Sequence, residues 1–245
     1  MSDYDILAKF YDDIMGDQKE FAQKVYRLIR SHLPRAGSLL ELGCGTGSYL
    51  QYLSKYYKTT GVDSSSVMLS VAREKLPDTE LYQASMIELN LDRKFDVIIC
   101  MNDTINHFTK ISEIKRIFSS CYENLTDNGI LIFDINTVHK LESLSDCPPI
   151  VHQFRENYFI TNVSRTTKDI YEWDLRIFEN ISDSTYKLHE ELLYERSYTI
   201  AQLKDYLGNK FKNIRFLDLN NKKISKKSER LHFICTKYVL KNSCS

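Results

Sequence analysis

The sequence predicts an α/β fold, in which a doubly wound, mainly parallel sheet carries a smaller set of inserted antiparallel strands. Three observations support this prediction. Short apolar segments alternate with amphipathic ones between residues 38 and 133, a glycine-rich loop directly follows the first apolar segment, and aromatic and β-branched residues dominate past residue 145. Alternation of strands and helices calls for a parallel sheet with helices on both of its faces.

Two amphipathic helices are expected before the sheet. Residues 3–15 and 18–33 each place their apolar side chains at the three- and four-residue spacing of one helical face. Pro34 and Gly37 are expected to end the second helix. The sheet then begins with an apolar strand at 38–42.

The α/β part continues as alternating strands and helices. Expected strands lie at 38–42, 58–62, 80–83, 95–101 and 130–133, and expected helices lie near 47–55, 65–75 and 111–125. Ser64 is placed to cap the second of these helices and Pro77 to stop it. Asn128 and Gly129 are expected to turn the chain into the last strand.

The pattern changes in the last hundred residues. Three segments lack a helical period and are expected to form antiparallel strands inserted into the α/β domain, namely 150–163, 168–181 and 185–198. A helix is expected at 199–208, because Thr199 and Gln202 form a capping box and Gly208 is a stop signal. Two closing strands are expected, at about 211–219 and 230–239.

Composition places the chain among ordinary globular proteins. Lys plus Arg and Asp plus Glu both number 33 in 245 residues, so the net charge is zero and gives no general attraction to nucleic acid or an anionic membrane. No apolar run approaches the ~18–20 residues of a membrane span, and the acidic N-terminus lacks a signal-peptide layout. The six cysteines are scattered without a C-x-x-C pair. We therefore expect a cytoplasmic, disulfide-free and metal-free protein, monomeric or homodimeric, with no membrane partner.

The most informative segment is the loop after the first strand. Gly43, Gly45 and Gly47 stand at alternate positions, and Asp63 follows twenty residues after Gly43, at the end of the second strand. Glycine lets a ligand lie directly on the backbone, and a carboxylate at this point of a βαβ unit accepts hydrogen bonds from ribose hydroxyls. The pattern therefore predicts a site for an adenosine-containing cofactor.

The glycine spacing limits which cofactor can bind. A dinucleotide fingerprint needs G-x-G-x-x-G, and here Ser48 occupies the position of its third glycine. The chain also lacks the G-x-x-x-x-G-K-S/T pattern of a P-loop. Three alternating glycines after an acidic strand suit a ligand without phosphates, whose amino-acid end and nucleoside lie on either side of the loop.

At these residues the chain resembles the class I S-adenosylmethionine-dependent methyltransferases. The segment ELGCGTG matches the cofactor-binding signature of that family, and Asp63, within TGVDSSSVML, matches its ribose-binding position. The resemblance implies a Rossmann-like sheet of seven strands with an antiparallel last strand. It also implies S-adenosyl-L-methionine as cofactor, with S-adenosyl-L-homocysteine as product. Three parts are expected: N-terminal helices and the cofactor-binding half at 1–148, inserted strands over the active site at 149–198, and a closing helix and hairpin at 199–245.

The resemblance also implies a set of cofactor-binding residues at the carboxyl ends of the strands. Ser85 stands where the family often carries an acid that accepts a hydrogen bond from the adenine amino group. A hydroxyl accepts the same bond without a charge to strengthen it, so we expect weaker anchoring of adenine. The expected set is Tyr11, Glu41, Gly43, Cys44, Gly45, Gly47, Asp63, Ser64, Met68, Ser85, Met86 and Met101.

Residues 102–108 should run past the transferable methyl group. Methyl transfer from a sulfonium is an in-line displacement, so positioning supplies much of the catalysis and a base is needed only for a protonated acceptor. His107 is the candidate base, with a structural role in the loop as the alternative. Tyr11 reaches the same space from a lid-like N-terminal segment, or serves only as a core aromatic. Five residues of the inserted strands either shape the acceptor pocket or pack a sheet face: Tyr158, Tyr171, Trp173, Tyr194 and Arg196.

Two further segments, YDILAKFYDDIM and NDTINH, resemble the bacterial N-methyltransferases of deoxyamino sugars, and YERSYTIAQLKDYL resembles an uncharacterised bacterial group of the same branch. This implies methyl transfer to a nitrogen or oxygen of a small-molecule acceptor. Three alternatives are an RNA or tRNA methyltransferase, supported only by the basic run 222–227, a non-catalytic S-adenosylmethionine-binding protein, and a Mg²⁺-dependent O-methyltransferase. The last would use Asp103, Asp134 and Asn136 as ligands.

Overall fold

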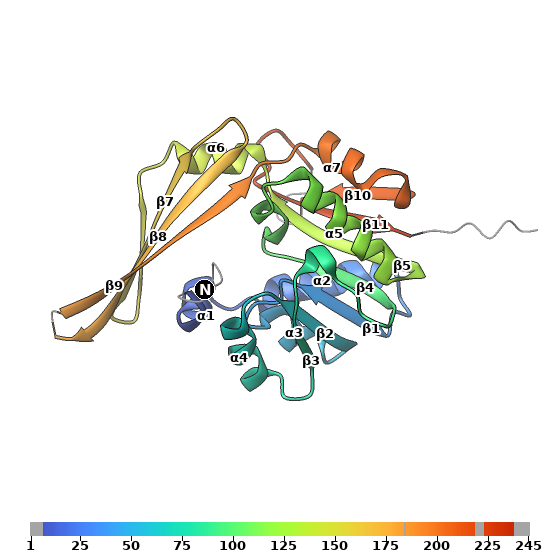
Figure 1. Cartoon of the computed structure of the whole chain (residues 1–245), viewed down its shortest axis with the longest axis horizontal. Helices are drawn as coiled ribbons and strands as arrows, with labels where there is room; N and C mark the ends of the chain where they lie inside the picture. Colours follow the sequence, from blue (N-terminus) through green and yellow to red (C-terminus); the bar gives the residue numbers. More distant parts are fainter. Residues whose placement is uncertain (1–6, 184, 219–222, 238–245) are drawn as a thin grey trace, which may run out of the picture.

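The computed structural model describes residues 7–183, 185–218 and 223–237. These residues form two sheets (Figure 1). The larger sheet has seven strands in the order β10-β11-β5-β4-β1-β2-β3, and the smaller has four strands in the order β6-β7-β8-β9. The predicted fold class is therefore confirmed, including the antiparallel last strand and the separate antiparallel sheet.

The larger sheet is parallel from β3 to β5. Its strands are β1 (Ser38–Leu42), β2 (Lys58–Asp63), β3 (Glu80–Gln83), β4 (Phe95–Cys100), β5 (Leu125–Asn136), β10 (Asn213–Leu217) and β11 (Arg230–Thr236). β1 pairs in parallel with both β2 and β4, whereas β11 is antiparallel to both β5 and β10. The chain leaves β1 towards β2 and β3 and later returns to place β4 on the other side of β1, so the strand order reverses there. Ligands of open α/β sheets bind at such a reversal.

Helices cover both faces of this sheet. They are α2 (Lys19–His32), α3 (Ser48–Leu53), α4 (Ser66–Lys75), α5 (Ile111–Asn124) and α7 (Ile200–Leu207). The helix α6 (Val138–Ser145) packs instead against the smaller sheet. The other short elements are an N-terminal helix, α1 (Tyr11–Met15), and four short turns, η1 (Leu7–Lys9), η2 (Met86–Glu88), η3 (Thr104–His107) and η4 (Gly208–Lys210). The capping box at the start of α7 is confirmed. Within the described parts of the chain, no helix combines the length and apolar character that crossing a bilayer requires.

Consecutive residues of the strands enter two different cores. In β1, Leu39 packs with α2 and α3 while Leu40 packs with α5 and α7, and Val97 and Ile98 of β4 divide in the same way. The division follows from the two-residue period of a strand, because helices on both faces bury every side chain. Each fully buried Leu or Ile contributes about 1.5–3 kcal/mol to stability.

One local expectation in this sheet is wrong. Ser65, and not Ser64, caps α4, and its side chain accepts a hydrogen bond from the Met68 amide. The Asp63 carboxylate accepts the Ser65 amide at 2.9 Å, which agrees with a helix that begins one residue later than expected. β5 runs from Leu125, but Leu125 pairs with Phe95 and Ile130 with Val97, so residues 126–129 interrupt the regular pairing where the turn before residue 130 was expected.

The smaller sheet has four strands where three segments were expected. They are β6 (Ile150–Phe154), β7 (Asn157–Arg165), β8 (Ile170–Ser182) and β9 (Thr185–Arg196). The segment 150–163 is split because Arg155 adopts φ 51°, a left-handed conformation that reverses the chain between β6 and β7. In Figure 1 the β8–β9 hairpin extends away from the seven-stranded sheet. The base of this sheet packs on η1 through Leu7 and Phe10.

Candidate active site

A cavity of about 330 Å³ lies at the carboxyl ends of β1, β2, β3 and β4. The loops that leave these four strands form most of its wall, as expected for an open α/β sheet. It is lined by Tyr11, Gly43, Gly45, Asp63, Ser64, Met68, Ala84, Ser85, Met86, Asn102, Thr104, His107 and Phe108. Nine of the residues singled out from the sequence are in this set, and four others, Glu41, Cys44, Gly47 and Met101, are not.

The glycine loop presents its backbone to the cavity. Gly43 has φ +67°, and a Cβ on it would lie 2.7 Å from Cγ2 of Thr104 and 3.3 Å from Cε of Met86. The amides of Gly43 and Cys44 both donate to the Val62 carbonyl, at 2.8 and 3.0 Å, which fixes the loop against β2. A side chain at position 43 would therefore fill space that is open to a ligand.

The four singled-out residues outside the lining support the loop from behind. Gly47 has φ +79°, and a Cβ there would lie 2.5 Å from Cδ1 of Leu76, so this glycine lets α3 approach the end of α4. Cys44 and Met101 are buried in the core. Glu41 is also buried, and its Oε2 has no hydrogen-bond partner among the described residues. Burial and, to a smaller extent, the nearby Asp63 carboxylate raise the pKa of Glu41 well above its usual value.

Asp63 stands between the glycine loop and α4. Its Oδ2 accepts the Gly45 amide at 2.8 Å and its Oδ1 accepts the Ser65 amide at 2.9 Å. Burial raises the pKa of Asp63, and these backbone donors oppose that rise because they favour the ionised form. Each carboxylate oxygen keeps further acceptor capacity, so the group can still receive two hydroxyls of a ligand.

The short helix α1 closes the cavity over the glycine loop. Tyr11 lines the cavity, and the neighbouring Asp12 accepts hydrogen bonds from Thr46 Oγ1 at 2.6 Å and from Lys75 Nζ at 2.7 Å. Burial raises the pKa of the Tyr11 hydroxyl, and the next cause is the charge of Asp103. The hydroxyl therefore stays protonated near neutral pH and can donate a hydrogen bond.

The turn after β3 forms another wall. Ser85 lines the cavity, and its Oγ accepts the Ile87 amide at 3.3 Å while keeping capacity for a second hydrogen bond. Met86 and Met68 are almost fully buried and supply apolar surface on either side. Ala84 lines the same wall and was not singled out from the sequence.

The loop after β4 brings His107 to the cavity. Asn102 and Asp103 have φ values of 57° and 51°, and two successive left-handed residues bend the chain sharply out of the strand. The Asp103 amide donates to Asp134 Oδ1 at 2.8 Å, and Thr104 Oγ1 donates to the Met101 carbonyl at 2.7 Å. Asn102, Thr104 and Phe108 also line the cavity; they lie inside the predicted stretch 102–108 but were not singled out.

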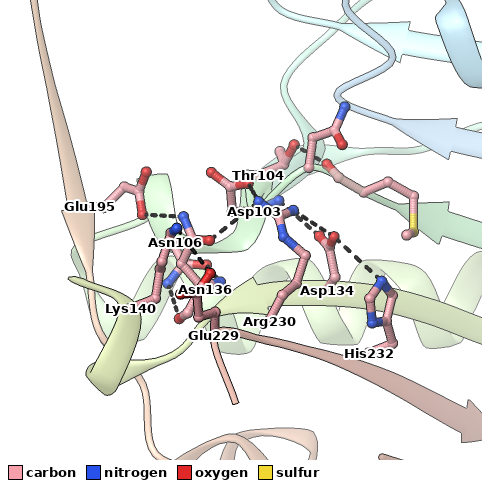
Figure 2. Close-up of polar contacts among 12 residues, drawn as sticks. Asp103, Thr104, Asn106, Asp134, Asn136, Lys140, Glu195, Glu229, Arg230 and His232 are labelled. Atoms are coloured by element: carbon pink, nitrogen blue, oxygen red, sulfur yellow. Dashed lines mark hydrogen bonds and ion pairs between the residues drawn. The ribbon is translucent and has the colours of Figure 1, made fainter. Parts of the chain in front are cut away.

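Behind this loop lies a polar network, which Figure 2 shows in close-up. The Arg230 guanidinium donates to a carboxylate oxygen of Asp103, to Asp134 at 2.7 Å and to Asn136 Oδ1 at 3.2 Å. The Asn136 amide nitrogen in turn donates to Glu195 Oε2 at 3.1 Å. These oxygens, which the sequence offered as Mg²⁺ ligands, are therefore partners of a guanidinium.

A second cavity of about 580 Å³ shares one lining residue, His107, with the first. Its other lining residues come from the end of η3 and from the four-stranded sheet: Thr109, Thr166, Ile170, Glu172, Leu193 and Tyr194. The Tyr194 hydroxyl donates to Glu172 Oε2 at 2.9 Å. His107 is thus reached from two sides, by the loops of the parallel sheet and by β8 and β9.

The other singled-out residues of the inserted strands do not line either cavity. Tyr171 is fully buried in a core with Leu141, and Trp173 packs against the same core. Tyr158 packs against Tyr186. Arg196 donates to the Thr109 carbonyl at 2.7 Å and so joins β9 to the loop after η3.

Comparisons with known proteins agree with this geometry. A family described as a methyltransferase domain matches residues 39–129, which include the glycine loop and His107. A Geobacillus sp. (strain WCH70) protein that carries the name of a methyltransferase is 28% identical over 96% of this chain and 99% of its own length. The dTDP-3-amino-3,4,6-trideoxy-alpha-D-glucopyranose N,N-dimethyltransferase of Streptomyces venezuelae is 32% identical over 53% of this chain and 55% of its own length.

The solved structures give the same result over the whole chain. The crystal structure of an S-adenosylmethionine-dependent methyltransferase from Clostridium acetobutylicum has a TM-score of 0.85 and 26% identity, covering 96% of this chain and 99% of its own. The glycine loop, the Asp63 carboxylate at the end of β2 and the sheet order agree with these matches. Residues 39–129 are a methyltransferase domain, and the chain as a whole has the fold of S-adenosylmethionine-dependent methyltransferases.

Proposed function

We propose that this protein transfers the methyl group of S-adenosylmethionine to a nitrogen or oxygen of a small-molecule acceptor. The observation that carries the proposal is that His107 lines two neighbouring cavities. One has the glycine loop and Asp63, which suit the cofactor, and the other has space and polar groups for a second molecule. A reaction between two bound molecules needs this arrangement, because the reacting atoms must be brought into line.

In the proposed complex the cofactor lies along the first cavity. Gly43 and Gly45 receive its methionine portion, and Asp63 accepts hydrogen bonds from the ribose hydroxyls, assisted by Ser64. Ser85, Met86 and Met68 surround the adenine. The residues behind the loop, Glu41, Cys44, Gly47 and Met101, act by shaping the floor of the cavity.

The acceptor is proposed to occupy the second cavity, with its nucleophilic atom at the junction, next to His107. His107 is the candidate base, because the junction is where a proton leaving the acceptor would be released. Tyr11 closes the cavity opposite His107 and donates its hydroxyl hydrogen bond to the cofactor. The S. venezuelae relative, which is named as an N,N-dimethyltransferase of an amino sugar, supports an acceptor of this size.

The alternative acceptor is an RNA. The described part of the basic run, Lys223, Lys226 and Lys227, is exposed and lies at a surface turn before β11, whereas Lys222 falls outside the described residues. Neither cavity is lined by these lysines. We therefore propose a small-molecule partner, in a cytoplasmic protein that is monomeric or homodimeric.

Thermal unfolding with added nucleosides tests the cofactor half of the proposal. A ligand at a hundredfold over its Kd stabilises a fold by about 2.7 kcal/mol, which for a chain of this size is about 5–10 °C. We expect this shift with S-adenosylmethionine and S-adenosylhomocysteine, and none with NAD. A shift with NAD alone would contradict the proposal.

Incorporation of a labelled methyl group tests the acceptor half. We expect label to enter low-molecular-weight compounds of a bacterial metabolite extract, and not bulk tRNA. Label in tRNA that is lost when Lys223, Lys226 and Lys227 are changed to Ala would favour the RNA alternative. Cofactor binding with no transfer to either material would favour a non-catalytic binding protein.

A further inference from the structure

Two carboxyl groups lie close to His107, the residue that lines both cavities, although neither Asp103 nor Glu195 is itself part of a cavity lining. Ligating atoms of Asp103, His107 and Glu195 all lie within 4.8 Å of one another. Asp103 comes from the loop after β4, His107 from the end of η3, and Glu195 from β9 of the four-stranded sheet. In Figure 2 the carboxyl groups of Asp103 and Glu195 lie on the same side of the Arg230 guanidinium, although the two residues come from different elements.

The charges of this group do not balance. Arg230 is shared between Asp103 and Asp134, so two carboxylates face one guanidinium. Glu195 is a third carboxyl group, is 2% exposed, and receives its hydrogen bond from the neutral amide of Asn136. His232 also lies near this group, 3.8 Å from Asp134, where burial lowers the imidazole pKa and favours the neutral ring.

The excess of negative charge affects the pKa values of Tyr11, which lines the cofactor cavity, and of Glu195. Asp103 is the largest of the charges that raise the pKa of Tyr11, which lines that cavity. Burial, followed by the charge of Asp103, raises the pKa of Glu195 well above its usual value, and the Asn136 amide and the Arg230 guanidinium oppose this rise only in part, so the protonated form is favoured. A positive charge placed at the junction would be attracted by Asp103 and would allow Glu195 to ionise.

We infer that Asp103 and Glu195 make the junction selective for an acceptor whose nucleophile is a basic amine, which arrives as an ammonium ion and gives its proton to His107. This rests on the proposed function, since it concerns the acceptor side of the same site, and it chooses nitrogen over oxygen. Asp103 and Glu195 are specificity-determining residues in this account. Glu172, which lines the second cavity, adds a further carboxylate on the proposed acceptor side.

The reaction step balances with the groups present. The ammonium nitrogen of the acceptor loses one proton to a ring nitrogen of His107 and regains its lone pair. That lone pair forms the new N–C bond with the methyl carbon. At the same time the C–S bond breaks, and the electron pair of the C–S bond passes to the sulfur atom. The products are a methylated ammonium ion and neutral S-adenosylhomocysteine, and the imidazolium left on His107 lies beside Asp103 and Glu195 until its proton reaches water.

The selectivity can be measured without knowing the acceptor. The probe is an S-adenosylmethionine analogue in which a carbon bearing an amino group replaces the methylated sulfur, so that an ammonium ion projects from the cofactor towards the junction. We expect the protein to bind this analogue about tenfold more tightly than S-adenosylhomocysteine, as one added charge interaction in a half-buried site would give. Isothermal titration calorimetry of both ligands gives the ratio of the two Kd values.

Variants of the two carboxyl groups test whether these groups cause the difference between the two Kd values. Glu195→Gln keeps the shape and an acceptor for the Asn136 amide, and we expect it to lower the ratio to about twofold while the Kd of S-adenosylhomocysteine stays within about twofold of its original value. Asp103→Asn should lower the ratio as well. The matched control is Glu190→Gln, the same change on the exposed face of β9, which should leave the ratio unchanged.

Two results would overturn the inference while leaving the proposed function intact: equal affinities for both ligands in the unchanged protein, or a preference for the analogue that Glu195→Gln and Asp103→Asn both retain. Failure of the protein to bind either ligand would instead contradict the proposed function. A circular-dichroism melting curve of each variant confirms that the comparison is made between folded proteins.

Discussion

The two cavities that share His107 as a lining residue are built in different ways. The cofactor cavity is made by short loops at the ends of adjacent parallel strands, and its key contacts are backbone amides and one carboxylate held by two of them. The second cavity is made by side chains from η3 and from β8 and β9, which are far apart in the sequence. The first is therefore fixed by the strand–loop–helix geometry, and the second depends on how the four-stranded sheet packs against it.

Replacing a glycine of the glycine loop by a larger residue should affect the first cavity and not the second. We expect this change to have the largest effect of those described. Gly43→Val adds atoms where the Cβ alone would lie 2.7 Å from Thr104, in a left-handed conformation that disfavours a branched residue. We expect affinity for S-adenosylmethionine to fall by about 100-fold or more, measured by calorimetry.

Gly16→Val is the matched control for this change. Gly16 also has a positive φ, but nothing lies within 4 Å of its Cβ position. It should cost about 1–2 kcal/mol of stability from backbone strain alone and leave cofactor affinity intact. Equal loss of affinity in both variants would mean that strain, and not filled space, is responsible.

Asp63→Ala should have the next largest effect. It removes the proposed acceptor of the ribose hydroxyls and frees the Gly45 and Ser65 amides. Two lost hydrogen bonds to a charged group correspond to about 2–3 kcal/mol, or about 30- to 150-fold in Kd. Asp78→Ala, at an exposed position at the opposite end of the strands, should leave the Kd unchanged; a similar loss there would remove the ribose assignment.

A change in the second cavity should leave the cofactor untouched. Tyr194→Phe removes the hydroxyl that holds Glu172 at 2.9 Å. We expect the rate of label transfer at low concentrations of metabolite extract to fall by about three- to tenfold, with an unchanged thermal shift for S-adenosylmethionine. Tyr186→Phe, at an exposed position of the same strand, is the control; equal rates in both variants would show that the acceptor does not depend on this wall.

The smallest expected effect concerns stability and pH. Glu41 has a raised pKa, so the folded protein holds a proton that the unfolded chain releases at its ordinary pKa. The stability that this proton supports is complete at low pH and is lost as the pH rises towards the folded-state pKa. The Glu41→Gln variant has no carboxyl group at this position and does not lose this stability. The free energy of unfolding of the variant minus that of the original protein should therefore be about 1 kcal/mol larger at pH 8 than at pH 5, as measured by urea unfolding.

Glu74→Gln, on the exposed face of α4, should show no such dependence on pH. A Glu41→Gln variant that loses stability equally at both pH values would mean that the ionised carboxylate has a partner that supports the fold. This outcome would revise the role of the residue behind the glycine loop, and would leave the cavity itself unchanged.

The sequence predicted most of the residues that line the first cavity, because the determinants of that cavity are local. Gly43, Gly45 and Asp63 belong to one strand–loop–helix–strand unit, and their spacing alone implies where they meet. Even here, one boundary differs from the expectation: Ser65 caps α4, and the Asp63 carboxylate accepts its amide. Such one-residue choices depend on the folded geometry of a neighbouring side chain.

The acceptor side was less predictable, for a physical reason. Glu195 and Arg230 lie in strands with ordinary alternation, and nothing in their sequence neighbourhoods marks them as partners of Asp103. Their meeting depends on the register of β11 against β5, which sets Arg230 beside Asn136, and on the packing of β9 against η3. Aromatic residues of the four-stranded sheet are divided between the core, where Tyr171 packs, and the second cavity, which Tyr194 lines.

The most direct test of the account is a crystal structure of the protein with S-adenosylhomocysteine. We predict the ribose hydroxyls on the Asp63 carboxylate, the amino-acid portion along Gly43 and Gly45, and the sulfur atom at the His107 end of the cavity, facing the second cavity. A ligand with its sulfur turned away from His107, or one bound outside this cavity, would contradict the claim that the two cavities are the cofactor and acceptor sides of one active site.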